Sequence, residues 1–537
     1  MPLNVTALVI FIALFVFITV LGFLAAHWRR GDLDILHEWG LAGGRFGTVV
    51  TWFLLGGDLY TAYTFIAVPA LVFGAGAIGF FALPYTIVVY PIVFVVFPRL
   101  WSVAKRHRYI TAADFVQGRF GNRWLALAIA VTGIVATMPY IALQLVGIQV
   151  VIAAMGIEFQ GNWLLSDLPL IIAFVILAAY TYSSGLRAPA MIAIVKDILI
   201  WVTVIAAVVV IPIELGGYGK IFASVPQAKL ILAAPPANGT GAYSAYATLA
   251  LGSALALFLY PHSVTGVLSS DSRHVIRRNS ALLPAYSFLL GLIALLGYMA
   301  IAAGVEKAPE FAAMFKQYSN SFAVPALILW AFPSWFAGIA FAAIAIGALV
   351  PAAIMSIAAA NLYTRNVYRA FIAPVCSDRQ EAQMAKLVSL VVKLGALFFI
   401  IFLPLKFAIQ LQLLGGIWIS QTIPAVIIGL YTRRLHHWAL FIGWAAGILT
   451  GTGMAYASNF QSAVYPLHLA GYVIPSYAAL YALALNIVVS VVLTPIFNVL
   501  GIAHGRDETS DGDYTSDEDR AMAVPGMAAA SGAAGRR

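Results

Sequence analysis

The chain has 537 residues, of which 62% are apolar and only 9% are charged. Soluble domains carry about 25% charged residues, so a chain this apolar cannot cover its surface with polar side chains. The composition therefore indicates a polytopic membrane protein and excludes soluble enzymes, nucleic-acid readers and secreted scaffolds. The formal net charge of +9 is explained below by where the basic residues lie.

The sequence also lacks the usual parts of nucleotide-driven or metal-dependent chemistry. Its single cysteine, Cys376, cannot form an intramolecular disulfide or a cysteine zinc cluster. A phosphate-binding glycine loop, a HExxH pair and a Cys-His array are all missing from the sequence. We therefore expect no enzyme, no resident cofactor or metal, and no nucleic-acid partner; protein partners cannot be read from the sequence.

Stretches of about 20 apolar residues, long enough to cross a bilayer as helices, occur thirteen times along the chain. The first lacks the basic start and small-residue cleavage site of a signal peptide, so we expect it to remain as a span. We place the spans near 4–26, 47–72, 76–98, 124–155, 168–183, 187–213, 245–267, 280–304, 324–362, 387–405, 410–431, 437–456 and 474–499.

Lysine and arginine are distributed unevenly between the loops. The loops after odd-numbered spans hold nineteen of them, whereas the opposite loops hold five. Because basic loops stay in the cytoplasm, this bias predicts an outside N-terminus and a cytoplasmic C-terminus. The positive net charge is thus a topology signal, and its unbroken alternation supports thirteen spans.

The end of the chain is different in kind. Segment 503–537 is polar and acidic at first and rich in Ala and Gly beyond. Such a segment buries too little apolar surface to order itself. We therefore expect a transmembrane domain at 1–502 followed by a disordered cytoplasmic tail, with docking to a partner as the alternative role of the tail.

Four charged residues fall well inside the expected spans, where a charge is costly and is by default a functional hypothesis. They are Asp58, Lys196, Asp197 and Lys393. For the two aspartates, a role in coupling or gating competes with a structural hydrogen bond. For the two lysines, structural pairing or extension to the membrane surface is the plainer interpretation.

Two spans carry signals of a broken helix. In the second, Gly56 and Gly57 precede Asp58 and a run of hydroxyl side chains, and glycine tolerates unwinding. In the seventh, Pro261 removes a helical donor and disfavours helix at the preceding residue. Interrupted helices in corresponding positions of two halves indicate a midplane site in an inverted-repeat transporter. Close packing through small residues is the alternative for the second span.

Three stretches resemble the solute:sodium symporter family. They are the glycine-rich second span, the segment 98–121 with its Thr-x-x-Asp-Phe-x-x-x-Arg-Phe signature, and the Ala-Ala-Ile-Met-Ser run at 352–356. The resemblance covers about residues 3–500. It implies an all-α membrane protein of about 13 helices, in which an inverted 5+5 core at about 47–431 follows one leading helix and precedes two trailing helices.

Within that family, segments 60–65 and 260–268 look most like bacterial monocarboxylate permeases. These import lactate, pyruvate, short-chain fatty acids and sometimes alanine. The resemblance therefore implies a symporter in the bacterial cytoplasmic membrane that works by alternating access and is driven by a cation gradient. A related symporter for another small solute, such as an amino acid, is the alternative; a channel or a membrane sensor is less well supported.

We expect the substrate to bind where the two helices break. The free N–H groups of a half-helix offer a positive end to a carboxylate, and nearby side chains add hydrogen bonds. The candidates are Tyr60, Thr61, Tyr63, Gln144, Tyr260 and His262, with Gln412 as a weaker one. Arginine is missing from the middle of the spans, which fits neutralisation of the substrate by a co-transported cation.

The resemblance also implies a sodium site, made by the backbone carbonyl groups of Gly56, Leu59 and Ala353 and the hydroxyl group of Ser356. Oxygen ligands suit this hard cation. The next residue is Ile357 where the family has a second hydroxyl. A proton is therefore the alternative coupled ion.

The two aspartates inside the expected spans, Asp58 and Asp197, are assigned to coupling or gating. Asp58, beside the break in the second span, would carry the proton if a proton is the coupled ion. Asp197 matches the aspartate of a Thr-Asp pair in the family, but Lys196 occupies the threonine position.

Overall fold

The computed structural model describes residues 1–28, 31–57, 59–157, 168–402 and 408–515. The first half contains the helices α1 (Val5–Leu24), α2 (Leu36–Leu41), α3 (Thr48–Gly57), α4 (Val68–Ala75), α5 (Ala82–His107), α6 (Ala112–Phe120), α7 (Arg123–Ala154), α9 (Leu168–Ser184), α10 (Arg187–Glu214), α11 (Tyr218–Ser224) and α12 (Gln227–Leu230).

The second half contains eleven further α-helices and one pair of strands. They are α13 (Gly241–Leu257), α14 (Pro261–Leu268), α15 (Arg273–Ala303), α16 (Ala312–Tyr318), α17 (Ala323–Ala331), α18 (Ser334–Tyr363), α19 (Asp378–Phe402), α20 (Ala408–Ile419), α21 (Ile423–Val426), α22 (His437–Ala457), β1 (Val464–Leu469), β2 (Tyr472–Tyr477) and α23 (Ala478–Val499).

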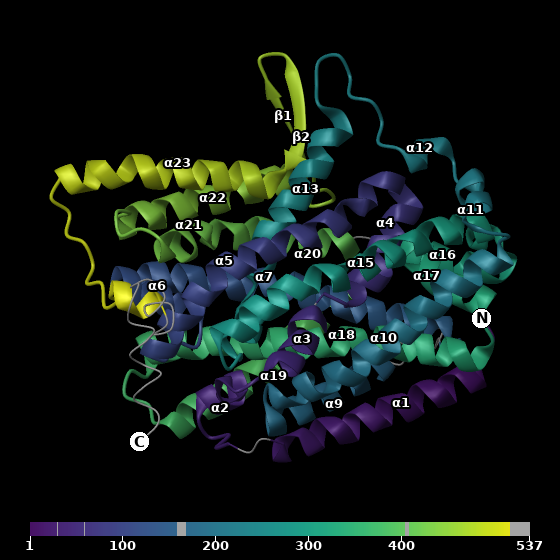
Figure 1. The fold of residues 1–537 in the computed structure, drawn as a ribbon, viewed down its shortest axis with the longest axis horizontal. Helices are drawn as coiled ribbons and strands as arrows, with labels where there is room; N and C mark the ends of the chain where they lie inside the picture. Colours follow the sequence, from purple (N-terminus) through teal and green to yellow (C-terminus); the bar gives the residue numbers. More distant parts are fainter. Residues whose placement is uncertain (29–30, 58, 158–167, 403–407, 516–537) are drawn as a thin grey trace, which may run out of the picture.

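The long helices lie roughly side by side in one bundle, with α1 and the α22–α23 pair at opposite edges (Figure 1). Helix α18 lies inside it and packs against α1, α7, α10 and α19. Its sequence is dominated by Ala and Gly, whose small side chains allow helices to approach closely. The many small residues of the expected span 324–362 therefore allow α18 to pack closely against its neighbours.

The polytopic helical fold is confirmed. By length and apolar composition, nine helices among the described residues could cross a membrane, or ten if the bent pair α13–α14 forms one span. One of the nine, Tyr63–His107, has 45 residues, about twice what one crossing needs, and Gly76 with a φ of 75° separates α4 from α5 inside it. The number thirteen stays a prediction.

Both expected helix breaks occur. Helix α3 ends at Gly57, and helical structure resumes only in the π-helical turn η3 (Tyr63–Ala67) that leads into α4. Helices α13 and α14 meet at an angle of 50°. Pro261 is the first residue of α14, where its missing N–H group is tolerated.

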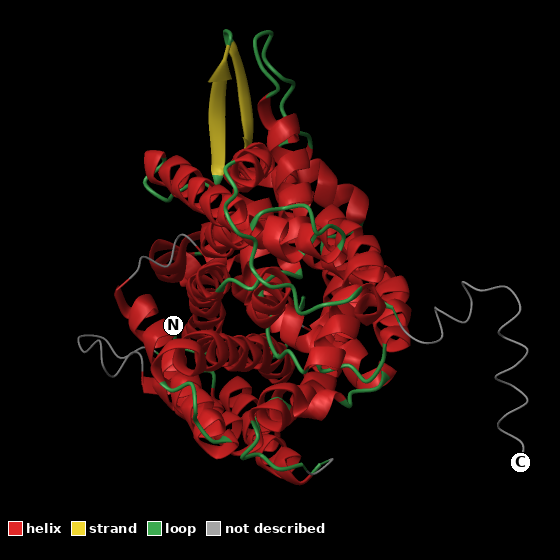
Figure 2. Cartoon of the chain, turned by 90° about the vertical axis from the view of Figure 1, so that its left-hand side faces the viewer, coloured by secondary structure: helices red, strands yellow, loops and turns green. Residues whose placement is uncertain are grey.

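A β-hairpin departs from the all-helical expectation. Strands β1 and β2 pair antiparallel and project from the bundle (Figure 2). Strand β2 occupies the start of the expected span 474–499, so α23 begins only at Ala478. The turn residues Ala470 and Gly471 both have positive φ, as a tight two-residue hairpin turn requires. Sequence reasoning missed this turn because it weighed only hydropathy in this region.

Residues 503–515, the first part of the tail that we expect to be disordered, make defined contacts with the bundle, and we call them the docked tail segment. Asp507 lies 2.5 Å from Arg119, and Asp513 lies 3.3 Å from Arg106. The Tyr514 side chain is buried. The acidic residues thus find basic partners at the ends of α5 and α6, which composition alone does not reveal. Residues 516–537 lie outside the described residues.

Replacing Asp513 by asparagine should loosen the docked tail segment. Burial tends to raise the pKa of the Asp513 carboxyl, but hydrogen bonds from His107 and Ser510 outweigh it, so the pKa lies below its ordinary value. Its contribution to docking is therefore complete above the ordinary pKa of about 4 and is lost as the pH falls through the lowered pKa. At neutral pH, we expect trypsin to cleave after Arg506 several-fold faster in the variant.

A matched control for this prediction is Asp511→Asn. The Asp511 side chain is 95% exposed, and exposed ion pairs contribute little to stability. Equal cleavage rates in both variants and the wild type would contradict the role of Asp513.

Candidate functional site

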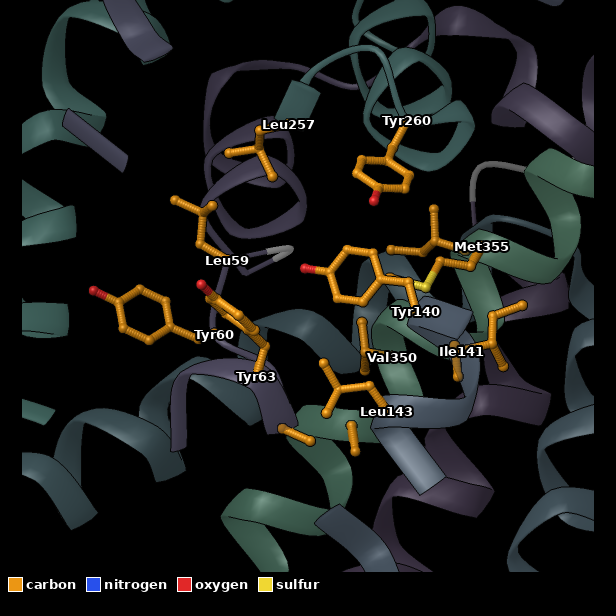
Figure 3. Close-up of a cluster of buried hydrophobic side chains, with 14 of the residues drawn as sticks. Leu59, Tyr60, Tyr63, Tyr140, Ile141, Leu143, Leu257, Tyr260, Val350 and Met355 are labelled. Carbon is orange, nitrogen blue, oxygen red and sulfur yellow. The ribbon is translucent and has the colours of Figure 1, made fainter. Parts of the chain in front are cut away.

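Three tyrosines and a histidine meet in the middle of the bundle, and we call them the aromatic cluster: Tyr63, Tyr140, Tyr260 and His262. The ring of Tyr140 lies 5.4 Å from that of Tyr260 and 5.5 Å from that of His262, measured between ring centres. Figure 3 shows Tyr63, Tyr140 and Tyr260 gathered around one space, with Tyr60 directed away from it. All four members are buried.

The two helix breaks bring this cluster together. Tyr63 begins the helical turn after the break in the second span, and Tyr260 is the last residue before α14. Tyr140 follows Pro139 within α7. The side chains therefore come from three separate spans, and the sequence-predicted residues Tyr63, Tyr260 and His262 do lie together.

Two buried polar groups, one in the aromatic cluster and one beside it, have no hydrogen-bond partner among the residues that the structure describes. The Tyr63 hydroxyl group and the side-chain oxygen of Gln412 are buried without a partner at hydrogen-bond distance among the described residues. The Tyr260 hydroxyl group donates to the backbone carbonyl of Gln412 at 3.0 Å, which places Gln412 beside the cluster. Because buried polar groups in native proteins are normally paired, such groups indicate a ligand or water site.

The half-helix after the first break does not offer free N–H donors, contrary to our expectation. The N–H group of Ala62 donates to Gln144 at 3.1 Å, and that of Tyr63 donates to the Thr61 hydroxyl oxygen at 3.0 Å. Thr64 accepts from the N–H group of Thr61. Gln144 and Thr61 thus cap the broken backbone, and their assignment to the substrate stays a prediction.

A second polar group, which we call the charged cluster, comprises Lys196, Asp197, Tyr60 and Tyr286. Asp197 lies 3.1 Å from the Lys196 ammonium group and accepts a hydrogen bond of 2.7 Å from the Tyr286 hydroxyl group. The Tyr60 hydroxyl group donates to the Tyr286 carbonyl group. Tyr60 therefore belongs to this cluster and not to the aromatic one. Asp58 lies outside the described residues.

The expected sodium site is only partly assembled. The Ser356 hydroxyl group donates to the carbonyl group of Ala353 at 2.8 Å, so these two ligands are adjacent. The carbonyl group of Gly56 instead accepts from the N–H group of Leu59 at 3.1 Å. Among the described residues, neither Gly56 nor Leu59 makes a hydrogen bond to Ser356, and the four-ligand set stays a prediction.

Helix α19 adds a neighbour that the sequence did not predict. The Ser389 hydroxyl group lies 3.3 Å from that of Ser356, and the Lys393 ammonium group donates to Ser389 at 2.7 Å. Ser389 thus supplies a second hydroxyl group where Ile357 has none. The same arrangement brings a buried lysine close to the expected ion.

A cavity of about 620 Å³ opens at the end of the bundle that the charge pattern predicts to be cytoplasmic. Burial and the nearby ammonium group of Lys105 lower the pKa of His37 on its wall. Ile110 lines both this cavity and a smaller one, which is also lined by Pro261. The two cavities therefore meet at Ile110, and the smaller one borders the start of α14.

Sequence reasoning missed three residues of these sites: Tyr140, Tyr286 and Ser389. Tyr140 and Ser389 each lie four residues before a residue that the sequence had singled out, Gln144 and Lys393. Residues four apart share a helix face, so this spacing was a usable signal. Tyr286 carries no such signal, because only the packing of α15 beside α10 brings it to Asp197.

A model of the sodium:solute symporter family matches residues 39–451. The chain belongs to this family. It is 54% identical over 505 residues to a protein of Rhizobium johnstonii named monocarboxylate transport permease protein, covering 92% of this chain and 97% of that one. An uncharacterized symporter of Bacillus subtilis is 33% identical over 92% of this chain and 94% of its own.

Among solved structures, a Na⁺-coupled sialic acid symporter in a substrate-bound, outward-open state matches with a TM-score of 0.71. It is 14% identical, and the match covers 94% of this chain and 99% of that one. At this identity the likeness shows the fold. Together these findings make the chain a multi-pass membrane transporter and not an enzyme.

Proposed function

We propose that this transporter imports small monocarboxylates, such as lactate, pyruvate and short-chain fatty acids, together with a cation by alternating access. The 54% identical relative named monocarboxylate transport permease protein supports this substrate class. The proposed location is the bacterial cytoplasmic membrane, with the N-terminus outside and the C-terminus in the cytoplasm.

The aromatic cluster is the observation that carries the proposal. It combines an apolar surround with the Tyr63 hydroxyl group and the His262 ring, and a short monocarboxylate has the matching form of one small apolar end and one charged end. Neutral donors can bind a carboxylate, and a hydrogen bond to a charged group contributes about 1.5–3 kcal/mol. The carboxylate charge itself would be balanced by the co-transported cation.

We propose sodium as that cation, because the family model and the adjacent Ala353 and Ser356 oxygen atoms favour it. A proton is the second candidate. It is favoured by Ile357, which removes one hydroxyl ligand, and by the Lys393 ammonium group near Ser356. Under either assignment, Asp58 and Asp197 are proposed to take part in coupling or gating.

Uptake into proteoliposomes tests both parts of the proposal. Labelled lactate should accumulate when an inward sodium gradient is imposed at fixed pH, and pyruvate and propionate should compete more strongly than alanine. Replacing sodium by choline should reduce accumulation at least tenfold. If lactate accumulates undiminished in choline and an uncoupler abolishes this accumulation, the coupled ion is a proton. If only an amino acid competes with lactate, the substrate class must be reassigned.

A further inference from the structure

Lys196 makes an unusual set of contacts for a buried lysine. Its side chain and that of Asp197 are fully buried on α10. The ammonium group donates to the backbone carbonyl groups of Gly57 and Tyr60, the latter at 3.2 Å, and lies 3.1 Å from the Asp197 carboxylate. Two of these three partners are main-chain oxygen atoms at the break in the second span.

These partners form the kind of oxygen set that binds a small monovalent cation. Main-chain carbonyl groups and a carboxylate are ligands for hard cations. The helix break makes the carbonyl groups available, since regular helix ends at Gly57 and resumes only at Tyr63. An ammonium group meets the same oxygen atoms through its three N–H donors.

The surroundings hold this set firmly in place. The Tyr286 hydroxyl group orients Asp197 through its 2.7 Å hydrogen bond. A side chain at Gly57 would place its first carbon 2.9 Å from the Lys196 nitrogen and 3.2 Å from a carboxylate oxygen of Asp197, so the Lys196 ammonium group would have to shift to make room for it. The arrangement therefore has the features of a built site and not of a lysine that extends to the membrane surface.

We propose that the Lys196 ammonium group is a resident cation that fills a monovalent-cation site at the break in the second span. The proposal rests on the cation-coupled transport proposed above and adds to it a fixed charge that does not move across the membrane. Lys196 neutralises Asp197 and ties α10 to the broken helix. A chain with a small neutral side chain at this position would need a mobile cation there instead.

Two substitutions separate the charge of Lys196 from its volume. Lys196→Ala removes both and leaves a vacancy, whereas Lys196→Met removes the charge but still fills the space. We expect the thermal unfolding midpoint of the purified Ala variant to lie below that of the wild type in choline chloride. Sodium, lithium or methylammonium at equal ionic strength should raise it by several degrees more than they raise the wild type. The Met variant should show no such added response.

Transport gives the second readout. Lactate uptake by the Ala variant should fall at least tenfold and should recover several-fold when methylammonium is added, whereas uptake by the Met variant should stay low. Lys220→Ala, a change at an exposed lysine, should match the wild type in both assays. Because the unfolding assay involves no substrate, it tests the cation site even if the proposed substrate is wrong.

Lys196→Thr is the alternative if the Ala variant does not purify. It creates the Thr-Asp pair of the family at positions 196 and 197 and should gain the same added response to sodium. If the Ala or Thr variant responds to cations no more than the Met variant does, Lys196 does not fill a cation site.

Discussion

Replacing His262 by alanine, or Tyr63 by phenylalanine, is expected to raise the half-saturating concentration of lactate by about tenfold or more. Each change removes one polar group of the aromatic cluster. A hydrogen bond to a charged group contributes about 1.5–3 kcal/mol, and 1.4 kcal/mol corresponds to a factor of ten in affinity. The measurement is the concentration dependence of uptake in proteoliposomes, corrected for the amount of protein inserted.

The hairpin offers controls of the same residue types. His468→Ala and Tyr472→Phe alter exposed side chains in β1 and β2 and should leave uptake unchanged. The maximal rate of the cluster variants should change less than their half-saturating concentration, because the helix break depends on Pro261 and stays in place. If the half-saturating concentration is unchanged in both cluster variants, the cluster does not bind the substrate. The helix break at Pro261 then has only a structural role.

The sequence was sufficient to predict the helix breaks, because they depend on local chemistry. A glycine pair weakens a helix, and Pro261 removes a donor at a fixed position. The α10 boundaries were also predictable, since the expected span 187–213 ends one residue before the observed Arg187–Glu214. Expected span ends differed more where a polar turn extends a helix beyond the apolar stretch, as at the start of α15.

Tertiary contacts explain what the sequence could not predict. Tyr60 and Tyr63 lie three residues apart on the same broken span, yet one joins the charged cluster and the other the aromatic cluster. The irregular backbone of residues 59–61 decides which way each side chain points, and hydropathy carries no information about it. In the same way, the docking of Asp507 depends on where α6 places Arg119.

Replacing Lys393 by methionine is expected to strengthen sodium binding if the ion lies at Ser356. The Lys393 nitrogen lies 2.7 Å from the Ser389 hydroxyl oxygen, which lies 3.3 Å from the Ser356 hydroxyl oxygen. The Lys393 nitrogen is therefore within about 6 Å of the Ser356 oxygen. Two positive charges at that distance repel by about 3 kcal/mol at an effective dielectric constant of about 20. Part of this is screened, so we expect the half-saturating sodium concentration for uptake to fall by about tenfold.

Two further variants make the comparison specific. Lys393→Arg keeps the charge and should not gain sodium affinity, and Ser356→Ala added to Lys393→Met should abolish the gain by removing the hydroxyl ligand. If a proton is the coupled ion, uptake should respond to the pH gradient and should not depend on sodium in any variant. A sodium dependence that stays unmoved in Lys393→Met would place the coupled ion away from Ser356, since a charge this close cannot leave a bound cation unaffected.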